Sequence, residues 1–302
     1  MKLFVIIVTY KGKQWYDRCF ASLRESTIPV QTVVVDNASN DGTVEYIREH
    51  FPEIHLIESP ENLGFGRANN MAIRYALDND CDYVFLLNQD TWIEPDAIEK
   101  LVAIHHQHPE YGILSPMHLK ADKRSLYIQI EDGRLDHGNK MLSDFYFQSI
   151  EDVYTVTYVN AAAWLLPRET LMSIGGFDPL FTHYSEDDDY LNRAIYHGLK
   201  IGICPHARIV HDHQDIENPL TPIGSRIRRD QQILLRLTNI NQRESFFSYV
   251  NYLIRKTIRS LLRCDLKEAR NYYGDFCYAR RQKKMIVNSR ALKTVKQPLW
   301  IE

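Results

Sequence analysis

Residues 1–118 alternate short apolar runs with segments of helical length, and this alternation limits the possible folds more than any other feature. We predict strands over Leu3–Val8, Thr32–Val35, Ile54–Glu58, Tyr83–Leu87 and Gly112–Pro116, and helices over Gln14–Ser26, Gly42–His50, Gly66–Asn79 and Pro95–His108. Strands that alternate with helices of this length are typical of parallel βαβ units. The continuously apolar first and second strands are expected to be covered on both faces. The pattern predicts an α/β fold with a mostly parallel open sheet and flanking helices.

The second half of the chain is less regular. Residues 119–160 mix aromatic, charged and glycine residues, which predicts long loops and short antiparallel strands. Regular structure is expected to resume near Ala161–Leu166, followed by helices over Glu169–Ile174 and Asp188–His197 and by short strands over Ile201–Cys204 and Arg208–Val210. From Ile223 onward, apolar residues recur at the spacing of amphipathic helices.

The net charge of −3 conceals a strong asymmetry along the chain. Residues 224–302, the basic tail, carry 18 Lys and Arg against 6 Asp and Glu, whereas residues 1–223 have a balance of −15. A basic helical segment suits an anionic membrane surface. It suits equally well a helical bundle that packs on the rest of the chain or on a second copy. Nucleic acid binding is disfavoured because no recognition motif accompanies the charge.

Three features of the sequence indicate a cellular compartment. The apolar N-terminus, Met1–Val8, is followed at once by polar residues and fits a buried first strand better than a signal peptide. No stretch approaches the roughly 20 apolar residues of a transmembrane helix. The five cysteines are scattered without a C-x-x-C pair, so neither a disulfide framework nor a zinc knuckle is indicated. A reducing cytoplasm is the expected compartment.

Polar side chains follow the predicted strands where each strand ends. Thr9 and Tyr10 follow the first strand, Asp36 ends the second, and Asn88-Gln89-Asp90 follows the fourth. Ligands of open α/β sheets bind at this carboxyl edge, and Mg²⁺-type cations bind through few carboxylates plus phosphate oxygens. The alternative to ligand binding is a structural role, in which these polar residues only end strands, form turns or cap helices. Asp36 is the hardest to explain in that way because it precedes the turn residues.

A glycine-rich turn, Glu61–Asn70, opens the third predicted helix. Gly64 and Gly66 permit close backbone approach, and Arg67 has the charge to meet a diphosphate. The G-x-G-x-x-G fingerprint fails, because Asn69 occupies the last glycine position and the turn follows the third strand rather than the first. NAD binding is therefore disfavoured, and an ordinary strand-to-helix turn remains the alternative.

The acidic run Glu186–Asp189 is the least expected local feature. Adjacent carboxylates repel one another and shift one another's pKa. The dipole of a solvated helix N-terminus explains part of the run. A carboxylate placed here also has the chemistry of a general base for an alcohol nucleophile. His211 follows the last predicted strand and is a candidate metal ligand, although a surface or supporting role is commoner for such a residue.

In their order along the chain, these motifs resemble glycosyltransferase family 2, the inverting enzymes with a GT-A fold, and they are similar to its bacterial rhamnosyltransferase-like members. The resemblance covers about residues 3–213. The matching pieces are Ile7–Tyr10, Val35–Ser39, Asn62–Asn70, Leu87–Asp90, Gly175–Asp178, Ser185–Asp189 and Val210–His211.

The resemblance implies a role for each matching residue. Nucleotide-sugar binding would be shared by Thr9, Tyr10, Asp36, Asn62, Gly66, Arg67 and Asn88. Asp90 would be the last residue of the family's D-x-D metal motif, and His211 would approach the metal or the diphosphate. Asp187 would be the catalytic base. The implied cofactor is a divalent cation, Mg²⁺ or Mn²⁺.

One departure from the family pattern concerns Asn88, which stands where D-x-D has its first acid. An amide must then make the sugar-nucleotide contact usually made by that acid, as in the Asn-x-Asp versions found among rhamnosyltransferase-like relatives. The departure keeps two alternatives open. One is a non-catalytic subunit that binds sugar nucleotides, and the other is a nucleotidyltransferase of similar fold.

The resemblance also implies an organisation and a reaction. Residues 1–222 would form the catalytic domain, with a nucleotide-binding half (1–118) and an acceptor-binding half (119–222), and residues 223–302 a basic helical extension. The reaction would move a sugar from a nucleotide-diphosphate sugar to a hydroxyl of a glycan or lipid-linked acceptor in cell-surface polysaccharide synthesis. The protein is expected in the cytoplasm, with peripheral contact at the inner face of the plasma membrane or homo-oligomer formation through the tail.

Overall fold

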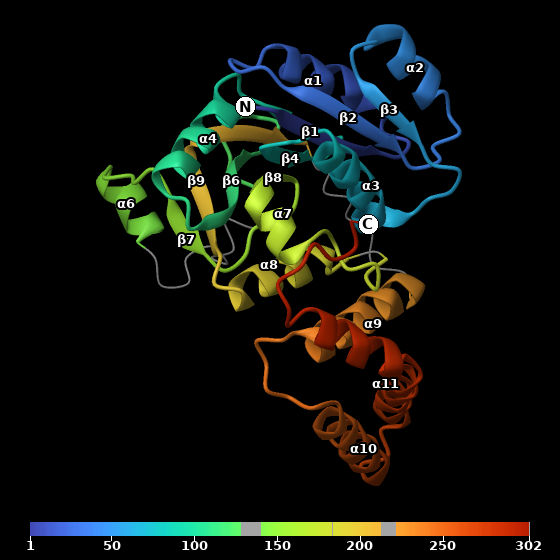
Figure 1. The fold of residues 1–302 in the computed structure, drawn as a ribbon. Helices are drawn as coiled ribbons and strands as arrows, with labels where there is room; N and C mark the ends of the chain where they lie inside the picture. The colour runs from blue at the N-terminus through green and yellow to red at the C-terminus, as the bar shows by residue number, and fades with distance from the viewer. Residues whose placement is uncertain (128–139, 183, 213–221, 302) are drawn as a thin grey trace.

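The computed structural model describes residues 1–127, 140–182, 184–212 and 222–301, without the side chains of residues 222 and 223. A mixed sheet lies between helices, and further helices extend from one end of the molecule (Figure 1). The strands are β1 (Leu3–Thr9), β2 (Gln31–Asp36), β3 (His55–Glu58), β4 (Tyr83–Leu87), β5 (Thr91–Ile93), β6 (Tyr111–Leu119), β7 (Tyr154–Val156), β8 (Ala163–Pro167) and β9 (Lys200–His211). The helices are α1 (Lys13–Arg24), α2 (Thr43–His50), α3 (Gly64–Asp78), α4 (Ala97–Gln107), α6 (Met141–Phe147), α7 (Arg168–Ile174), α8 (Glu186–Tyr196), α9 (Pro222–Thr238), α10 (Phe246–Leu262) and α11 (Leu266–Leu292).

One half of the sheet is parallel, as the alternation of strands and helices predicts. The strands follow one another in the order β3, β2, β1, β4. Thr9 pairs with Asp36, and Asp36 pairs with Glu58, so the carboxyl ends of these strands share one edge. This edge is where ligands of open α/β sheets bind.

The other half of the sheet departs from the parallel pattern. β8 inserts antiparallel between β4 and β6, so the fifth predicted strand does not pair with the fourth. β9 pairs parallel with β6 and antiparallel with β5 and β7. It is one strand of 12 residues where the sequence predicted two short ones. Residues 205–207 bulge out of its ladder with β6, and this irregularity interrupts the strand pattern.

The described part of residues 119–160 contains one expected and one unexpected element. β7 is a short antiparallel strand, which confirms that part of the prediction. Helix α6 was not predicted, because its seven residues are too few to display a clear helical period. Residues 128–139 lie outside the described residues.

The hydrophobic core consists of two layers, one on each face of the sheet. Alternate side chains of β1 enter opposite layers, Phe4 and Ile6 on one face and Val5 and Ile7 on the other. Helices α3, α7 and α8 cover the first face, and α1, α2 and α4 cover the second. Burial on both faces explains why these strands are continuously apolar in sequence.

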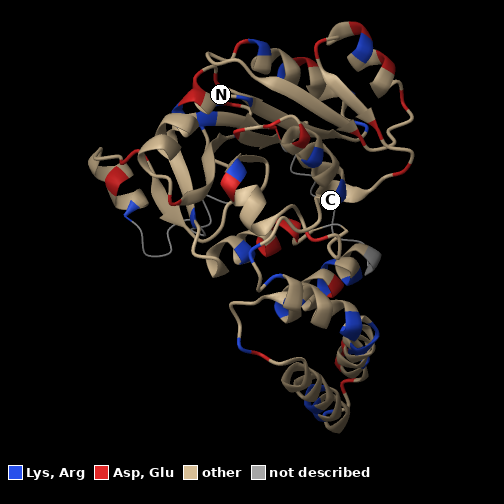
Figure 2. Cartoon of the chain, in the orientation of Figure 1, with Lys and Arg blue, Asp and Glu red and all other residues tan. Residues whose placement is uncertain are grey.

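The basic tail folds into helices α9, α10 and α11, which share a smaller core with Phe181. Figure 2 shows Lys and Arg on each of these helices. The end of the tail returns to the sheet domain, where the Leu299 carbonyl accepts a hydrogen bond from Gly176 N (2.8 Å) and the Ile301 carbonyl accepts one from Arg74 Nη1 (3.0 Å). Among the described residues, no helix combines the length and the hydropathy needed to cross a membrane.

Candidate active site

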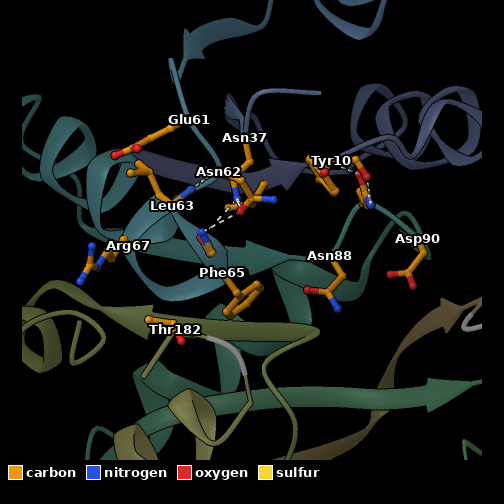
Figure 3. Close-up of a pocket in the computed structure, with 13 residues that line it drawn as sticks. Tyr10, Asn37, Glu61, Asn62, Leu63, Phe65, Arg67, Asn88, Asp90 and Thr182 are labelled. Atoms are coloured by element: carbon orange, nitrogen blue, oxygen red, sulfur yellow. Dashed lines mark hydrogen bonds between the residues drawn. The ribbon is translucent and has the colours of Figure 1, made fainter. Parts of the chain in front are cut away.

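A cavity of about 660 Å³ opens at the carboxyl edge of the parallel half-sheet (Figure 3). Its wall comes from the segments that follow β1, β2, β3 and β4, from the first turn of α3 and from the loop before α8. The lining residues are Val8, Tyr10, Asn37, Glu61, Asn62, Leu63, Gly64, Phe65, Arg67, Asn88, Gln89, Asp90 and Thr182. A cavity of this volume and mixed polarity is typical of a small-molecule site.

Five of the predicted site residues line this cavity, namely Tyr10, Asn62, Arg67, Asn88 and Asp90. Figure 3 shows Asn88 and Asp90 on the loop after β4, with Tyr10 nearby and Arg67 at the other end of the cavity. The motifs, which are widely separated in sequence, therefore meet in one place. Their chemical roles remain predictions.

Thr9 and Asp36 lie behind the cavity wall rather than on it, with 0% and 3% of their surfaces exposed. Thr9 Oγ1 and Ser39 Oγ both donate to Asp36 Oδ1, at 3.2 and 2.5 Å, and the Ser39 backbone N–H donates to Oδ2 at 3.0 Å. Thr9 is completely buried in this structure, and its part in nucleotide-sugar binding stays a prediction. In this structure, both residues brace the turn that brings Asn37 to the cavity.

Asn37 and Asn62 join two neighbouring turns of the cavity wall. Asn37 Oδ1 accepts from Leu63 N (2.7 Å), and Asn37 Nδ2 donates to Asn62 Oδ1 (3.0 Å). Asn62 Oδ1 also accepts from Gly64 N (2.9 Å). The sequence assigned no role to Asn37, because asparagine after a strand is also ordinary turn chemistry.

Gln89 is a second residue whose role the sequence did not reveal. Its Oε1 accepts from the Tyr10 backbone N–H (2.9 Å) and its Nε2 donates to the Tyr10 carbonyl (3.2 Å). A Cβ at Gly12 would lie 2.3 Å from Gln89 Oε1, so this contact requires glycine there. The amide thus fixes the segment after β1 to the loop that carries Asn88 and Asp90.

The glycine-rich turn supports the cavity in a different way from the one predicted. Gly66 does not line it, because Gly66 faces Phe177, whose Cβ would lie 2.9 Å from an added Cβ. Gly64 has a φ of +78° and closely approaches the Thr182 carbonyl, which explains the need for glycine. Arg67 lines the cavity, and its Nη2 donates to the Pro179 carbonyl at 3.2 Å.

Asp90 and His211 are brought together by the antiparallel pairing of β5 with β9. Asp212 N donates to the Asp90 carbonyl (2.9 Å), and His211 Nε2 lies 3.4 Å from Asp90 Oδ1. A carboxylate oxygen in the cavity wall and a buried imidazole nitrogen beside it fit a divalent cation of the Mn²⁺ or Mg²⁺ type. Within the described ranges, no group of three His, Cys, Asp or Glu side chains completes a metal cage. An ion held here must draw its other ligands from phosphate oxygens and water.

A smaller hollow of about 150 Å³ adjoins the first cavity and shares Phe65 and Asn88 with it. Glu186 and Asp187, from the start of α8, line this hollow. Tyr158 Oη donates to Asp187 Oδ2 (3.3 Å), and Asp188 N donates to Asp187 Oδ1 (2.8 Å). The carboxylate predicted as the base is therefore held by its neighbours beside the cavity.

Burial makes both of these acids more basic than ordinary carboxylates. Burial raises the pKa of Asp187, against the opposing effect of its hydrogen bonds. Burial and then the neighbouring charge of Asp187 raise the pKa of Glu186 to about 7. A raised pKa makes a carboxylate a better proton acceptor, which suits general base catalysis.

The last residue of the acidic run, Asp189, has a structural role. It is 1% exposed and pairs with Lys293 Nζ (2.5 Å) and Arg193 Nε (3.2 Å). Lys293 also pairs with Asp178 (2.9 Å), which accepts from Ser289 Oγ (2.6 Å). Within the acidic run, Glu186 and Asp187 therefore face the hollow, whereas Asp189 joins α8 to the end of α11.

The fold and this site define the class of protein. The sequence model of glycosyl transferase family 2 matches residues 4–169. The chain belongs to that family.

Known proteins with similar sequences include bacterial rhamnosyltransferases. The N-acetylglucosaminyl-diphospho-decaprenol L-rhamnosyltransferase of Mycobacterium tuberculosis is 26% identical over 68% of this chain and 75% of its own length. The dTDP-rhamnosyl transferase RfbF of Shigella flexneri is 24% identical over 85% of this chain and 87% of its own. These proteins support the resemblance to rhamnosyltransferase-like members.

Solved structures show the same fold. The mannosyltransferase PcManGT from Pyrobaculum calidifontis, solved with GDP-Man and Mn²⁺, superposes with a TM-score of 0.56 and 17% identity. The superposition covers 97% of this chain and 73% of that structure. It confirms the predicted GT-A fold class.

Proposed function

We propose that this protein transfers a sugar from a nucleotide-diphosphate sugar to an acceptor hydroxyl, with inversion at the anomeric carbon, in the synthesis of a cell-surface polysaccharide. The observation that carries the proposal is that the cavity and the smaller hollow adjoin each other. A cavity of nucleotide size at the sheet edge adjoins a hollow lined by two carboxylates of raised pKa. Donor and base thus have adjacent places, with Asn88 and Phe65 between them.

The lining residues suggest how the donor lies. Tyr10 is 41% exposed, and it offers a ring and backbone groups to the nucleoside beside the asparagines of the cavity wall. Arg67 places a guanidinium against the cavity for diphosphate or sugar oxygens. Asp90 and His211 would hold a divalent cation on the diphosphate, and such an ion supplies charge neutralisation for the leaving group.

The transfer itself needs a single protein base. The Asp187 carboxylate takes the proton of the acceptor hydroxyl, and the hydroxyl oxygen forms the new bond to the anomeric carbon. The bond from that carbon to the diphosphate oxygen breaks at the same time, and its electron pair leaves with the diphosphate. Attack from the face opposite the leaving group inverts the configuration. No second carboxylate is required, in contrast to glycoside hydrolysis.

The relatives indicate a donor and an acceptor to try first. Both relatives described above are named as rhamnosyltransferases. The name of the Shigella flexneri protein includes the donor, dTDP-rhamnose, and the name of the Mycobacterium tuberculosis protein includes a diphospho-decaprenol acceptor. We propose dTDP-rhamnose as the donor and a lipid-diphosphate-linked sugar as the acceptor. Asn88 would contact the donor through its amide, in place of the first acid of D-x-D.

The competing function is a non-catalytic subunit that binds sugar nucleotides. Asn88 favours this function, because it places an amide where the family pattern has a carboxylate, between the cavity and the hollow. Tight donor binding without sugar transfer or donor hydrolysis, under any divalent metal, would establish that function instead. A nucleotidyltransferase would release pyrophosphate from a nucleoside triphosphate.

A thermal-shift screen of sugar nucleotides with Mn²⁺ or Mg²⁺ tests donor binding. At 100 times its dissociation constant, a ligand adds about 2.7 kcal/mol to the free energy of unfolding, so the true donor is expected to raise the melting temperature by several degrees. The change Asp90→Ala is expected to remove the metal-dependent part of this shift. An absence of stabilisation by every sugar nucleotide, with and without metal, would contradict the proposal.

The proposed location follows from the acceptor and the tail. A lipid-linked acceptor is presented at a membrane, and the basic tail carries a charge balance of +12. We propose that the protein works in the cytoplasm at the inner face of the plasma membrane.

A further inference from the structure

Helix α10 has two apolar faces, and the helical bundle uses only one of them. Tyr249 and Leu253 are buried in the core shared with α9 and α11. A second stripe, the outer face of α10, is exposed to solvent. It consists of Phe247 (66% exposed), Ile254 (40%), Ile258 (52%), Leu261 (51%) and Leu262 (81%). Their spacing of three, four and seven residues places them on one side of the helix.

Basic side chains border this apolar stripe. Arg255 and Arg259, one turn apart, are exposed next to Ile254 and Ile258, and the exposed Arg263 follows the end of the helix. From residue 245 to residue 264 the sequence contains no Asp or Glu. The charged side chains that α10 itself contributes beside this apolar face are therefore all cationic.

The position of α10 leaves this face available. Figure 1 places the helix at the end of the bundle farthest from the sheet, with α11 packed against it. None of these five large apolar side chains belongs to the bundle core, and monomeric proteins rarely expose such a row without an interaction to explain it.

We propose that the outer face of α10 is a docking surface for an anionic lipid bilayer. The helix would lie in the interface plane, with its apolar stripe among the upper acyl chains and its arginines on lipid phosphates. This combination of an apolar face and a cationic border is what an interfacial helix requires. The charge complementarity favours a bilayer over a second copy of the chain, because the same basic border would repel its counterpart across a symmetric contact.

The proposal goes beyond the transfer reaction and is tested apart from it. Vesicles of phosphatidylglycerol and phosphatidylcholine are sedimented with the full chain, alongside vesicles of phosphatidylcholine alone. We expect binding to the anionic vesicles that weakens as salt is raised. The variant Ile254→Ser/Ile258→Ser/Leu262→Ser is expected to lose binding, and Arg255→Gln/Arg259→Gln to weaken it about tenfold or more.

A matched control separates the α10 face from the overall charge of the tail. The variant Arg280→Gln/Arg281→Gln removes the same charge from exposed positions of α11 and is expected to weaken binding much less than Arg255→Gln/Arg259→Gln. Melting temperatures equal to that of the parent would show that the variants fold. Equal loss in the two arginine variants, equal binding to neutral vesicles, or a dimer that the serine variant dissociates while vesicle binding persists would overturn the proposal.

Discussion

The change Asp187→Asn is expected to reduce sugar transfer by a factor of about 10² to 10⁴ while donor affinity stays near that of the parent protein. Asparagine keeps the size and the hydrogen-bonding oxygen of the side chain but cannot take a proton. Asp187 lies in the hollow beside the donor cavity rather than in the cavity itself, so the donor retains its contacts. The measurement is the transfer rate at saturating donor, together with calorimetric titration of the donor.

The pH profile and two neighbouring variants sharpen this test. A base works in its deprotonated form, so the raised pKa of Asp187 predicts that activity falls as pH is lowered through that pKa. Asp188→Asn is the matched control, with the same chemical change one residue away, and should retain most of the activity. Full activity in Asp187→Asn, with loss in Glu186→Gln instead, would transfer the role of base to Glu186.

The change Lys293→Met is expected to lower the free energy of unfolding by about 3–5 kcal/mol. Lys293 Nζ is the shared partner of Asp178 (2.9 Å) and Asp189 (2.5 Å), and the three side chains are almost completely buried. Burial opposes ionisation of Asp178, yet Lys293 and Ser289 together hold its pKa below the ordinary value. Without the lysine, buried carboxylates would lose their counter-charge, which is more costly than losing an exposed ion pair.

Chemical denaturation of Lys293→Met, compared with the same substitution at a nearby exposed lysine, measures this loss of stability. Lys296→Met removes the same group from an exposed position three residues along the chain and should change stability by less than about 0.5 kcal/mol. Equal stability in the two variants would show that the buried pairs do not hold the end of α11 to α8. Because α8 also carries Asp187, loss of the Lys293 contacts is expected to reduce activity as well.

The sequence is most informative where a local pattern corresponds to a local structure. The apolar runs of β1 and β2 and the helices between them are recognisable because burial on both faces leaves a continuous apolar signal. Tyr10, Asn88 and Asp90 were predicted to meet because parallel strands end at one edge of the sheet. The cavity lining agrees with that prediction.

The remaining features depend on pairings between distant segments, which no local pattern encodes. The insertion of β8 between β4 and β6 is set by long-range packing. Gly66 lies in a glycine-rich turn that suggested close approach to a ligand, but in the structure its missing side chain makes room for Phe177. Asp189 and Glu186 look alike in sequence, and the buried pairing of Asp189 with Lys293, over a hundred residues away, distinguishes it from the acid that faces the hollow.

The central claim is that the cavity and the neighbouring carboxylate together perform an inverting sugar transfer. The most direct measurement follows the reaction by ³¹P and ¹H NMR, with the donor that stabilises the protein and a lipid-diphosphate-linked sugar as acceptor. We predict release of the nucleoside diphosphate and a new glycosidic bond whose anomeric configuration is opposite to that of the donor. Retention of the donor's configuration, or release of pyrophosphate from a nucleoside triphosphate without sugar transfer, would contradict the claim.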